Sequence, residues 1–200
     1  MNPAIAARAV LLASWPALMS GGAYVTPFDG VSSATPIAIF SQSAEAVSSA
    51  TANAVIPPSM IDLFLGRIPG CIGEVSKIAI LLGLAYLLLR KTITWHIPVT
   101  MIASFMLFTL AFGGDPLQGV LMGSVLFGAV FMATDYVTCP MTHAGQMIFA
   151  AGAGLILALI RAFGGYPEGT TYAILLMNVL TPLIDRVTRG RIYGEVKSRA

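Results

Sequence analysis

Long apolar stretches, separated by short polar breaks, make up most of this 200-residue chain. A helix that crosses the hydrocarbon core of a bilayer needs about 20 mostly apolar residues. Five stretches after residue 70 approach that length: Ile72–Leu89, Ile97–Phe112, Leu117–Ala133, Met147–Phe163 and Thr171–Ile184. The breaks between them, such as "GGDP" and "GGYPEG", contain the residues that end helices. The pattern predicts an all-α polytopic membrane protein.

An earlier run, Ala4–Met19, has a similar apolar character but contains Arg8 and Pro16. It fits a first membrane span, which raises the predicted number of transmembrane helices to about six. The alternative is a secretory signal peptide, with Met1 to Arg8 as its charged region. Pro16 and the poor cleavage site around "SGGA" favour the span.

Composition agrees with a membrane protein. Hydrophobic residues make up 56% of the chain and charged residues 10%, and the mean hydropathy is +0.83. A soluble domain carries about 25% charged residues. The net charge of +2 is too small to indicate nucleic-acid binding. The two cysteines and two histidines are isolated in sequence, so no metal site is predicted.

The basic residues predict an orientation. Arg90 and Lys91 follow one predicted span, and the tail after Ile184 carries five more basic residues. Cytoplasmic loops are enriched in Lys and Arg, so we expect both of these basic regions on the cytoplasmic side of the membrane. The predicted organisation is a first transmembrane segment (1–20), an outward loop (21–70), a five-helix membrane bundle (71–185) and a basic cytoplasmic tail (186–200).

The outward loop contains the polar stretch "DGVSSATP", residues 29–36. Thr35 and Pro36 occupy the N-cap and first position of a predicted short amphipathic helix. A helix N-terminus also favours a phosphate group, so the Thr35 hydroxyl could be esterified there, with Asp29 orienting it. The pattern leaves both interpretations open.

Four segments carry a resemblance to a known family: "DGVSSATP", "DLFLGRIPGCIGEVSKIAILLG", "FMATDYVTCPMTHAGQ" and "IRAFGGYPEGTTYAILLMNVLTPLIDR". The chain resembles the carboxy-terminal part of the D subunits of Rnf complexes, which are homologous to the B subunit of the sodium-pumping NADH:quinone reductase. Several positions depart from the family pattern, among them Ser33, where Gly is frequent, and Lys77, where the family has an apolar residue. The family has further spans before this region, so we expect a fragment or a split gene.

The resemblance implies a covalent FMN, attached through its phosphate to Thr35 by a flavin transferase. The implied cofactor-binding set also contains Ser32, Ser33, Asp29 and Glu74, and a second, non-covalent flavin (riboflavin) is a further expectation.

The implied function is electron transfer within an ion-translocating ferredoxin:NAD oxidoreductase that moves Na⁺ or H⁺. The implied partners are the other Rnf subunits, including the G-type subunit that also bears FMN on a threonine, and membrane lipid. The alternatives are a component like the B subunit of the quinone reductase, or a transporter-like bundle without flavin.

Two polar groups lie within or beside the apolar spans. Glu74 and Lys77 are three residues apart, which predicts a shared helix face and an interfacial ion pair, or else a flavin or ion path. Asp135, close to Thr138, fits either cation binding or the capping of a helix end. Glu168 and Asp185 are predicted to be structural caps.

Overall fold

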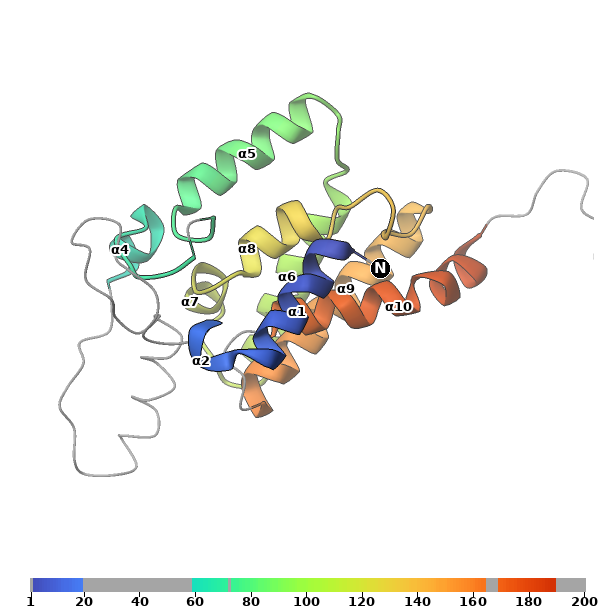
Figure 1. Cartoon of the computed structure of the whole chain (residues 1–200). Coiled ribbons are helices and arrows are strands. Elements are labelled where there is room, and N and C mark those ends of the chain that lie inside the picture. The colour runs from blue at the N-terminus through green and yellow to red at the C-terminus, as the bar shows by residue number, and fades with distance from the viewer. Residues whose placement is uncertain (1, 20–58, 72, 165–168, 190–200) are drawn as a thin grey trace, which may run out of the picture.

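The computed structural model describes residues 2–19, 59–71, 73–164 and 169–189, and every regular element within them is helical. This confirms the prediction of an all-α chain. The helices, in chain order, are α1 (Pro3–Ser14), α2 (Pro16–Met19), α4 (Met60–Leu65), α5 (Lys77–Leu89), α6 (His96–Ala111), α7 (Pro116–Leu121), α8 (Val125–Phe127), the π-helix η2 (Gly128–Met132), α9 (His143–Phe163) and α10 (Thr170–Thr188) (Figure 1).

The first helix begins and ends at clear local signals. Asn2 caps α1, because its side-chain oxygen accepts hydrogen bonds from the main-chain nitrogens of Ala4 and Ile5, and Pro3 occupies the first turn. The helix ends before Trp15, and Pro16 begins α2. The predicted run Ala4–Met19 is therefore two helices.

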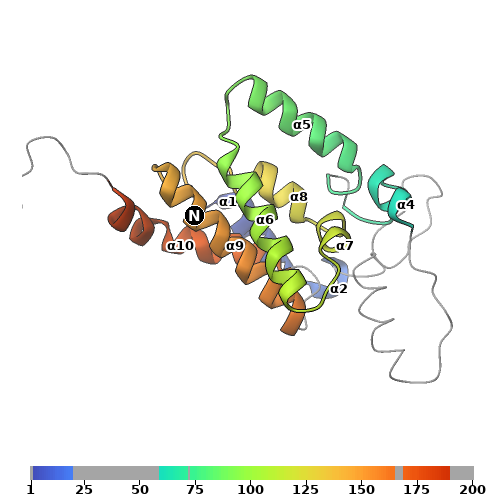
Figure 2. The ribbon, with the colours of Figure 1, turned by 180° about the vertical axis from the view of Figure 1, so that it is seen from behind.

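The core lies where α6, α9, α10 and α1 pack together (Figures 1 and 2). Its fully buried side chains include Ile5, Met101, Phe105, Phe149 and Ile174. Gly154 permits the close approach of α9 to α6, since a Cβ there would overlap the Ser104 hydroxyl oxygen. Small residues let helix backbones approach in this way.

Helix lengths differ from the predicted spans. Within the described residues, α9 is the one helix that is long and apolar enough to cross a membrane, and α1, α5 and α6 are shorter apolar helices. The stretch Leu117–Ala133, predicted as one span, is divided into α7, α8 and η2. The prediction of one continuous helix there is wrong, and the number of spans stays a prediction.

Helix α5 lies at the side of the bundle, next to α4 and α8, in both views (Figures 1 and 2). Leu82 and Leu89 on this helix are 67% and 82% exposed. The helix therefore presents an apolar face outward.

The end of α5 and the end of α10 lie at the same end of the bundle. The turn before α6 meets the first turn of α9, because the Thr94 hydroxyl donates to Gln146 and the rings of His96 and His143 stack. The end of α10 reaches the N-cap of α9 through a hydrogen bond between Thr142 and Thr188. Arg90, Lys91 and Arg186 thus belong to the same end, while the rest of the predicted basic tail, residues 190–200, lies outside the described residues.

Candidate functional site at the break between α7 and α8

Four of the five predicted cofactor-binding residues lie outside the described residues: Asp29, Ser32, Ser33 and Thr35. The fifth, Glu74, is described and is 6% exposed. It lies in the turn that precedes α5, and it is the starting point for the site described below.

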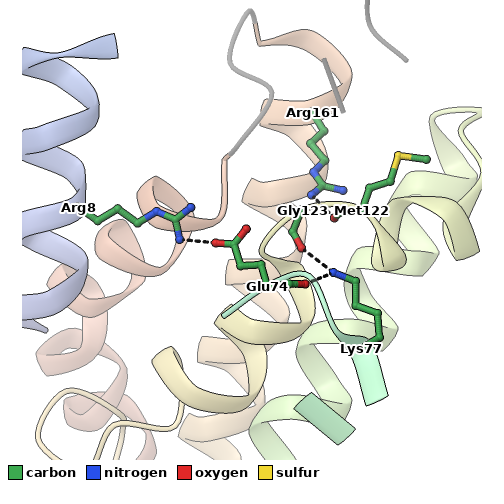
Figure 3. Close-up of polar contacts among 6 residues, drawn as sticks. All are labelled: Arg8, Glu74, Lys77, Met122, Gly123 and Arg161. Atoms are coloured by element: carbon green, nitrogen blue, oxygen red, sulfur yellow. Dashed lines mark hydrogen bonds and ion pairs between the residues drawn. The ribbon is translucent and has the colours of Figure 1, made fainter. Parts of the chain in front are cut away.

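The carboxylate of Glu74 is paired with a residue from the first helix. The guanidinium of Arg8 donates to Glu74 Oε1 at 2.8 Å, and the two side chains are 15% and 8% exposed (Figure 3). The two residues are 66 positions apart in the chain. This partly buried ion pair therefore fixes α1 against the turn at the start of α5.

Lys77 is the first residue of α5 and is 1% exposed. Its ammonium group donates to the main-chain carbonyl of Glu74 at 2.5 Å and to that of Gly123 at 3.4 Å (Figure 3). Because α5 begins at Lys77, Glu74 and Lys77 do not share a helix face, and both are buried. The predicted interfacial pair is in fact an interior contact made through the Glu74 main chain.

The chain between α7 and α8 turns away from the helix axis. Met122 has an extended backbone and Gly123 has a φ of 65°, a left-handed conformation that favours glycine. The last carbonyl groups of a helix lack partners within the helix. The break after Leu121 therefore leaves backbone acceptors inside the bundle for other groups to satisfy.

A second cation satisfies these acceptors. Arg161, in the last turn of α9, donates to the carbonyl oxygens of Gly119 and Met122 at 2.5 and 3.1 Å. Its guanidinium carbon lies 5.1 Å from the centre of the Phe105 ring, within range of a cation–π contact. Lys77 and Arg161 thus bind the backbone at the break from two sides. Both cations lie near the carboxy-terminal end of α7, where the partial negative charge of the helix dipole stabilises them.

The site combines a broken helix, carbonyl groups directed into the bundle and four charged side chains. Discontinuous helices of this kind occur in membrane transporters, where protein groups satisfy the free backbone.

Known proteins match the chain over nearly its whole length. A model of the NQR2, RnfD, RnfE family matches residues 1–194. This chain belongs to that family.

Members of the NQR2, RnfD, RnfE family with close similarity include components of two named complexes. The D subunit of the Na⁺-translocating ferredoxin:NAD⁺ oxidoreductase complex of Acetobacterium woodii is 48% identical over 98% of this chain and 60% of its own length. The D subunit of the proton-translocating ferredoxin:NAD⁺ oxidoreductase complex of Clostridium ljungdahlii is 43% identical over 96% of this chain and 61% of its own length. The chain thus spans about three fifths of each relative.

The sequence predicted some of the charged residues that meet at the break between α7 and α8. It indicated Glu74 and Lys77, which the structure brings together, and it noted Arg8 in an apolar run without identifying Glu74 as its partner. The contribution of Arg161 was missed. A single arginine near the end of the apolar stretch Met147–Phe163 was the available indication, because an intramembrane charge needs a partner.

Asp135 and Asp185 have structural contacts. Asp135 accepts a hydrogen bond from the Thr138 hydroxyl at 3.1 Å, a local contact that leaves both cation binding and the capping of a helix end as predictions. Asp185 accepts a hydrogen bond from the main-chain nitrogen of Met141 at 3.1 Å and so holds the loop before α9.

Burial raises the pKa of the nearby Cys139 thiol above its ordinary value. A backbone hydrogen bond lowers this pKa, and the carboxylates of Asp135 and Asp185 raise it further. Glu168 lies outside the described residues.

Proposed function

We propose that this chain forms part of the D subunit of an Rnf-type ferredoxin:NAD oxidoreductase, which transfers electrons through FMN on Thr35 and couples them to Na⁺ or H⁺ transport. The observation that supports this proposal most strongly is the match of residues 1–194 to the family, together with two relatives named as D subunits of such complexes. One relative is named for Na⁺ and the other for protons, so the names do not decide the ion.

In the proposed role, the bound flavin supplies the redox chemistry and the protein places it. A threonine hydroxyl is a weak nucleophile without an activating group, so a flavin transferase is a proposed partner during maturation. Ser32, Ser33 and Asp29 flank the acceptor residue. Glu74, whose carboxylate is paired with Arg8, is proposed to act together with them.

The exposed faces of the helices support a place in a bilayer. Leu82 on α5, Leu107 on α6 and Val179 on α10 are each more than 60% exposed. Exposed apolar side chains on helix after helix are typical of surfaces that meet lipid or other membrane subunits. The outward face of α5 is a proposed contact with lipid or with another component of the complex.

The orientation follows from the shared basic end. Arg90, Lys91 and Arg186 belong to the end at which α6 and α9 begin. The positive-inside rule assigns this end to the cytoplasm. The opposite end of the bundle, where α7 and α10 begin, is then the outer side, and the Thr35 loop is proposed to lie there.

One observation favours a second candidate, a transporter-like bundle without flavin. The break between α7 and α8 has the discontinuous form found at transport sites. A third candidate, a component of a sodium-pumping quinone reductase, shares the family model. Quinone reduction by the assembled complex distinguishes this candidate from a ferredoxin:NAD enzyme.

The decisive experiment is the fluorescence of the denatured protein. The full chain, expressed with its flavin transferase, is expected to give a fluorescent band under ultraviolet light on a denaturing gel. Thr35→Ala abolishes this band and leaves membrane insertion intact, because loss of one cap costs only about 1 kcal/mol. Ser32→Ala and Ser33→Ala are the matched controls and retain at least part of the fluorescence. A fluorescent Thr35→Ala protein, or a wild type without fluorescence, contradicts the proposal.

A further inference from the structure

Apolar side chains are exposed in the loop between η2 and α9, residues 133–142, which is called the exposed loop below. Val137 and Met141 are 88% and 85% exposed, and Tyr136 is exposed beside them. Apolar side chains that cluster on a surface mark contacts with ligands, proteins or membranes. The exposed loop is therefore a candidate contact surface, and the residues around it indicate what it contacts.

The exposed loop is held against the turn between α5 and α6. The Tyr136 hydroxyl donates to the main-chain carbonyl of Thr92. Lys91, directly before Thr92, is exposed and has a φ of 54°, and among the described residues it is the one non-glycine residue with a positive φ. Glycine is the usual residue in this left-handed position after a helix. The chain thus has a cation beside the exposed loop at a position that favours glycine.

The other side of the exposed loop is held by the end of α10. Asp185 accepts a hydrogen bond from the main-chain nitrogen of Met141. Arg186 follows Asp185 directly, Arg189 follows one turn later, and both arginines are exposed. Cations from two separate elements therefore border the exposed loop.

Cations outnumber carboxylates at this end of the bundle. Two described carboxylates lie there, and both accept hydrogen bonds within the protein: Asp135 from the Thr138 hydroxyl and Asp185 from the Met141 main chain. Four described basic residues lie at the same end: Arg90, Lys91, Arg186 and Arg189. The excess of positive charge favours an anionic partner.

The apolar and aromatic residues next to these cations follow the order of layers in a membrane. The apolar face of α5 continues to Leu89, directly before Arg90. Trp95, which is exposed, belongs to the turn that follows, and Tyr136 is bound to that turn. Trp and Tyr are enriched at the boundary between hydrocarbon and headgroups, and Lys and Arg on its cytoplasmic side. An anionic phospholipid offers acyl chains and a charged headgroup in the same order.

We propose that the exposed loop, with Lys91 and Arg186 on its two sides, binds anionic phospholipid at the membrane surface. Val137 and Met141 enter the layer below the headgroups, and the two cations meet headgroup phosphates. This inference rests on the proposed function, because it takes the basic end of the bundle as a membrane boundary. A soluble acidic protein is the alternative partner, and it would meet the cations but not the apolar face of α5 beside them.

Trp95 provides the readout, because the chain contains two tryptophans and Trp15→Phe leaves Trp95 alone. The full chain with this substitution, expressed without flavin transferase, is placed in phosphatidylcholine nanodiscs. The nanodiscs contain increasing fractions of either brominated phosphatidylglycerol or brominated phosphatidylcholine, and contact with bromine quenches tryptophan fluorescence. Phosphatidylglycerol is expected to give half-maximal quenching at a mole fraction about fivefold lower than phosphatidylcholine, the factor for one cation at an anionic headgroup. High salt should reduce this preference.

The variant Lys91→Gln with Arg186→Gln removes one cation from each side of the exposed loop. Its two quenching curves are expected to coincide. Arg67→Gln is the matched control, because Arg67 is an exposed cation at the opposite end of α5 and its loss should leave the preference unchanged. All three positions are on the surface, so the melting temperatures in neutral detergent should stay close to that of the parent protein.

Two results would overturn the lipid site. One is equal quenching of the parent protein by both lipids, and the other is an unchanged preference in the Lys91→Gln, Arg186→Gln variant. If that variant keeps the lipid preference but no longer copurifies with other subunits of the complex, the surface binds protein instead. The flavin test is independent of these measurements: absence of a fluorescent band contradicts the proposed electron-transfer role and leaves a measured lipid preference standing.

Discussion

At the scale of single residues, the charged side chains around the break between α7 and α8 each have a specific partner within the bundle. The sequence predicted a pair between Glu74 and Lys77 from their spacing. Spacing reports neighbours along one helix, whereas the carboxylate of Glu74 pairs with Arg8 from 66 residues away. A contact over that distance depends on packing of helices, so the sequence could indicate the charges but not their partners.

Replacement of one member of the Arg8–Glu74 pair is expected to destabilise the protein. Arg8→Gln removes the cation that donates to the Glu74 carboxylate, and loss of one member of a buried pair costs up to about 3–5 kcal/mol. The melting temperature of the purified protein should therefore fall by several degrees. The double variant Arg8→Gln with Glu74→Gln should recover much of the loss, because the uncompensated charge is gone.

Arg90→Gln provides the control for this prediction. Arg90 is exposed at the end of α5, so its replacement should change the melting temperature little. If the double variant is as unstable as the sum of the two single variants, the two residues act independently and the ion pair contributes no coupling.

At the scale of elements, the division of one apolar stretch into α7, α8 and η2 is the main departure from the sequence prediction. Hydropathy measures how apolar a segment is on average, and Leu117–Ala133 is mostly apolar. It does not show where the backbone hydrogen bonds go. Here the carbonyl groups at the break are satisfied by Arg161 and Lys77 from other helices. Glycine at 119, 123 and 128 was the available indication, yet glycine is equally common where helices only pack closely.

The contact of η2 with α10 can be tested by a single methyl group. Gly128→Ala is expected to destabilise the bundle by about 1–3 kcal/mol, because its Cβ would lie 2.5 Å from the Thr170 methyl group. Thr170→Ser removes that methyl group and keeps the hydroxyl. The double variant should therefore regain most of the lost melting temperature.

Gly113→Ala serves as a comparison for strain without crowding. Nothing lies within 4 Å of a Cβ at Gly113, although its φ is 81°. Thr170→Ser should not rescue this variant. Rescue of Gly113→Ala, or failure to rescue Gly128→Ala, would show that the recovery has another cause than the relieved contact.

At the scale of the whole molecule, the two basic regions and the order of the helices define two ends. The sequence predicted that Arg90 and Lys91 share a side with the basic tail, and residues 190–200 of that tail lie outside the described residues. The contacts of Thr142 with Thr188 and of Thr94 with Gln146 bring the end of α10 and the turn before α6 to the start of α9, and the membrane side of this end stays a prediction. The predicted number of spans depends on helix lengths, which packing alters.

Reporter fusions test the orientation. A reporter fused after Ala200 should be active on the cytoplasmic side, and one inserted at Gln42 should be active on the outer side. Equal activity of both fusions on one side would contradict the topology and the outward position of Thr35. If the two reporters are active on the opposite sides from those expected, the predicted number of membrane crossings is retained but the orientation of the protein is reversed. A third fusion, at Gly114 between α6 and α7, should agree with the insertion at Gln42.

The packing of the first helix against the last one has a consequence for synthesis of the protein. Helix α1 lies against α10, and Ile5 is fully buried in the shared core. The ribosome completes α1 long before α10, by roughly ten to thirty seconds at about 5–20 residues per second. During that interval α1 has no final partner, and the bundle cannot close. The segment around Thr35 is synthesised early in this interval, so the proposed flavin attachment has a period in which the nascent chain is present and the core is not yet assembled.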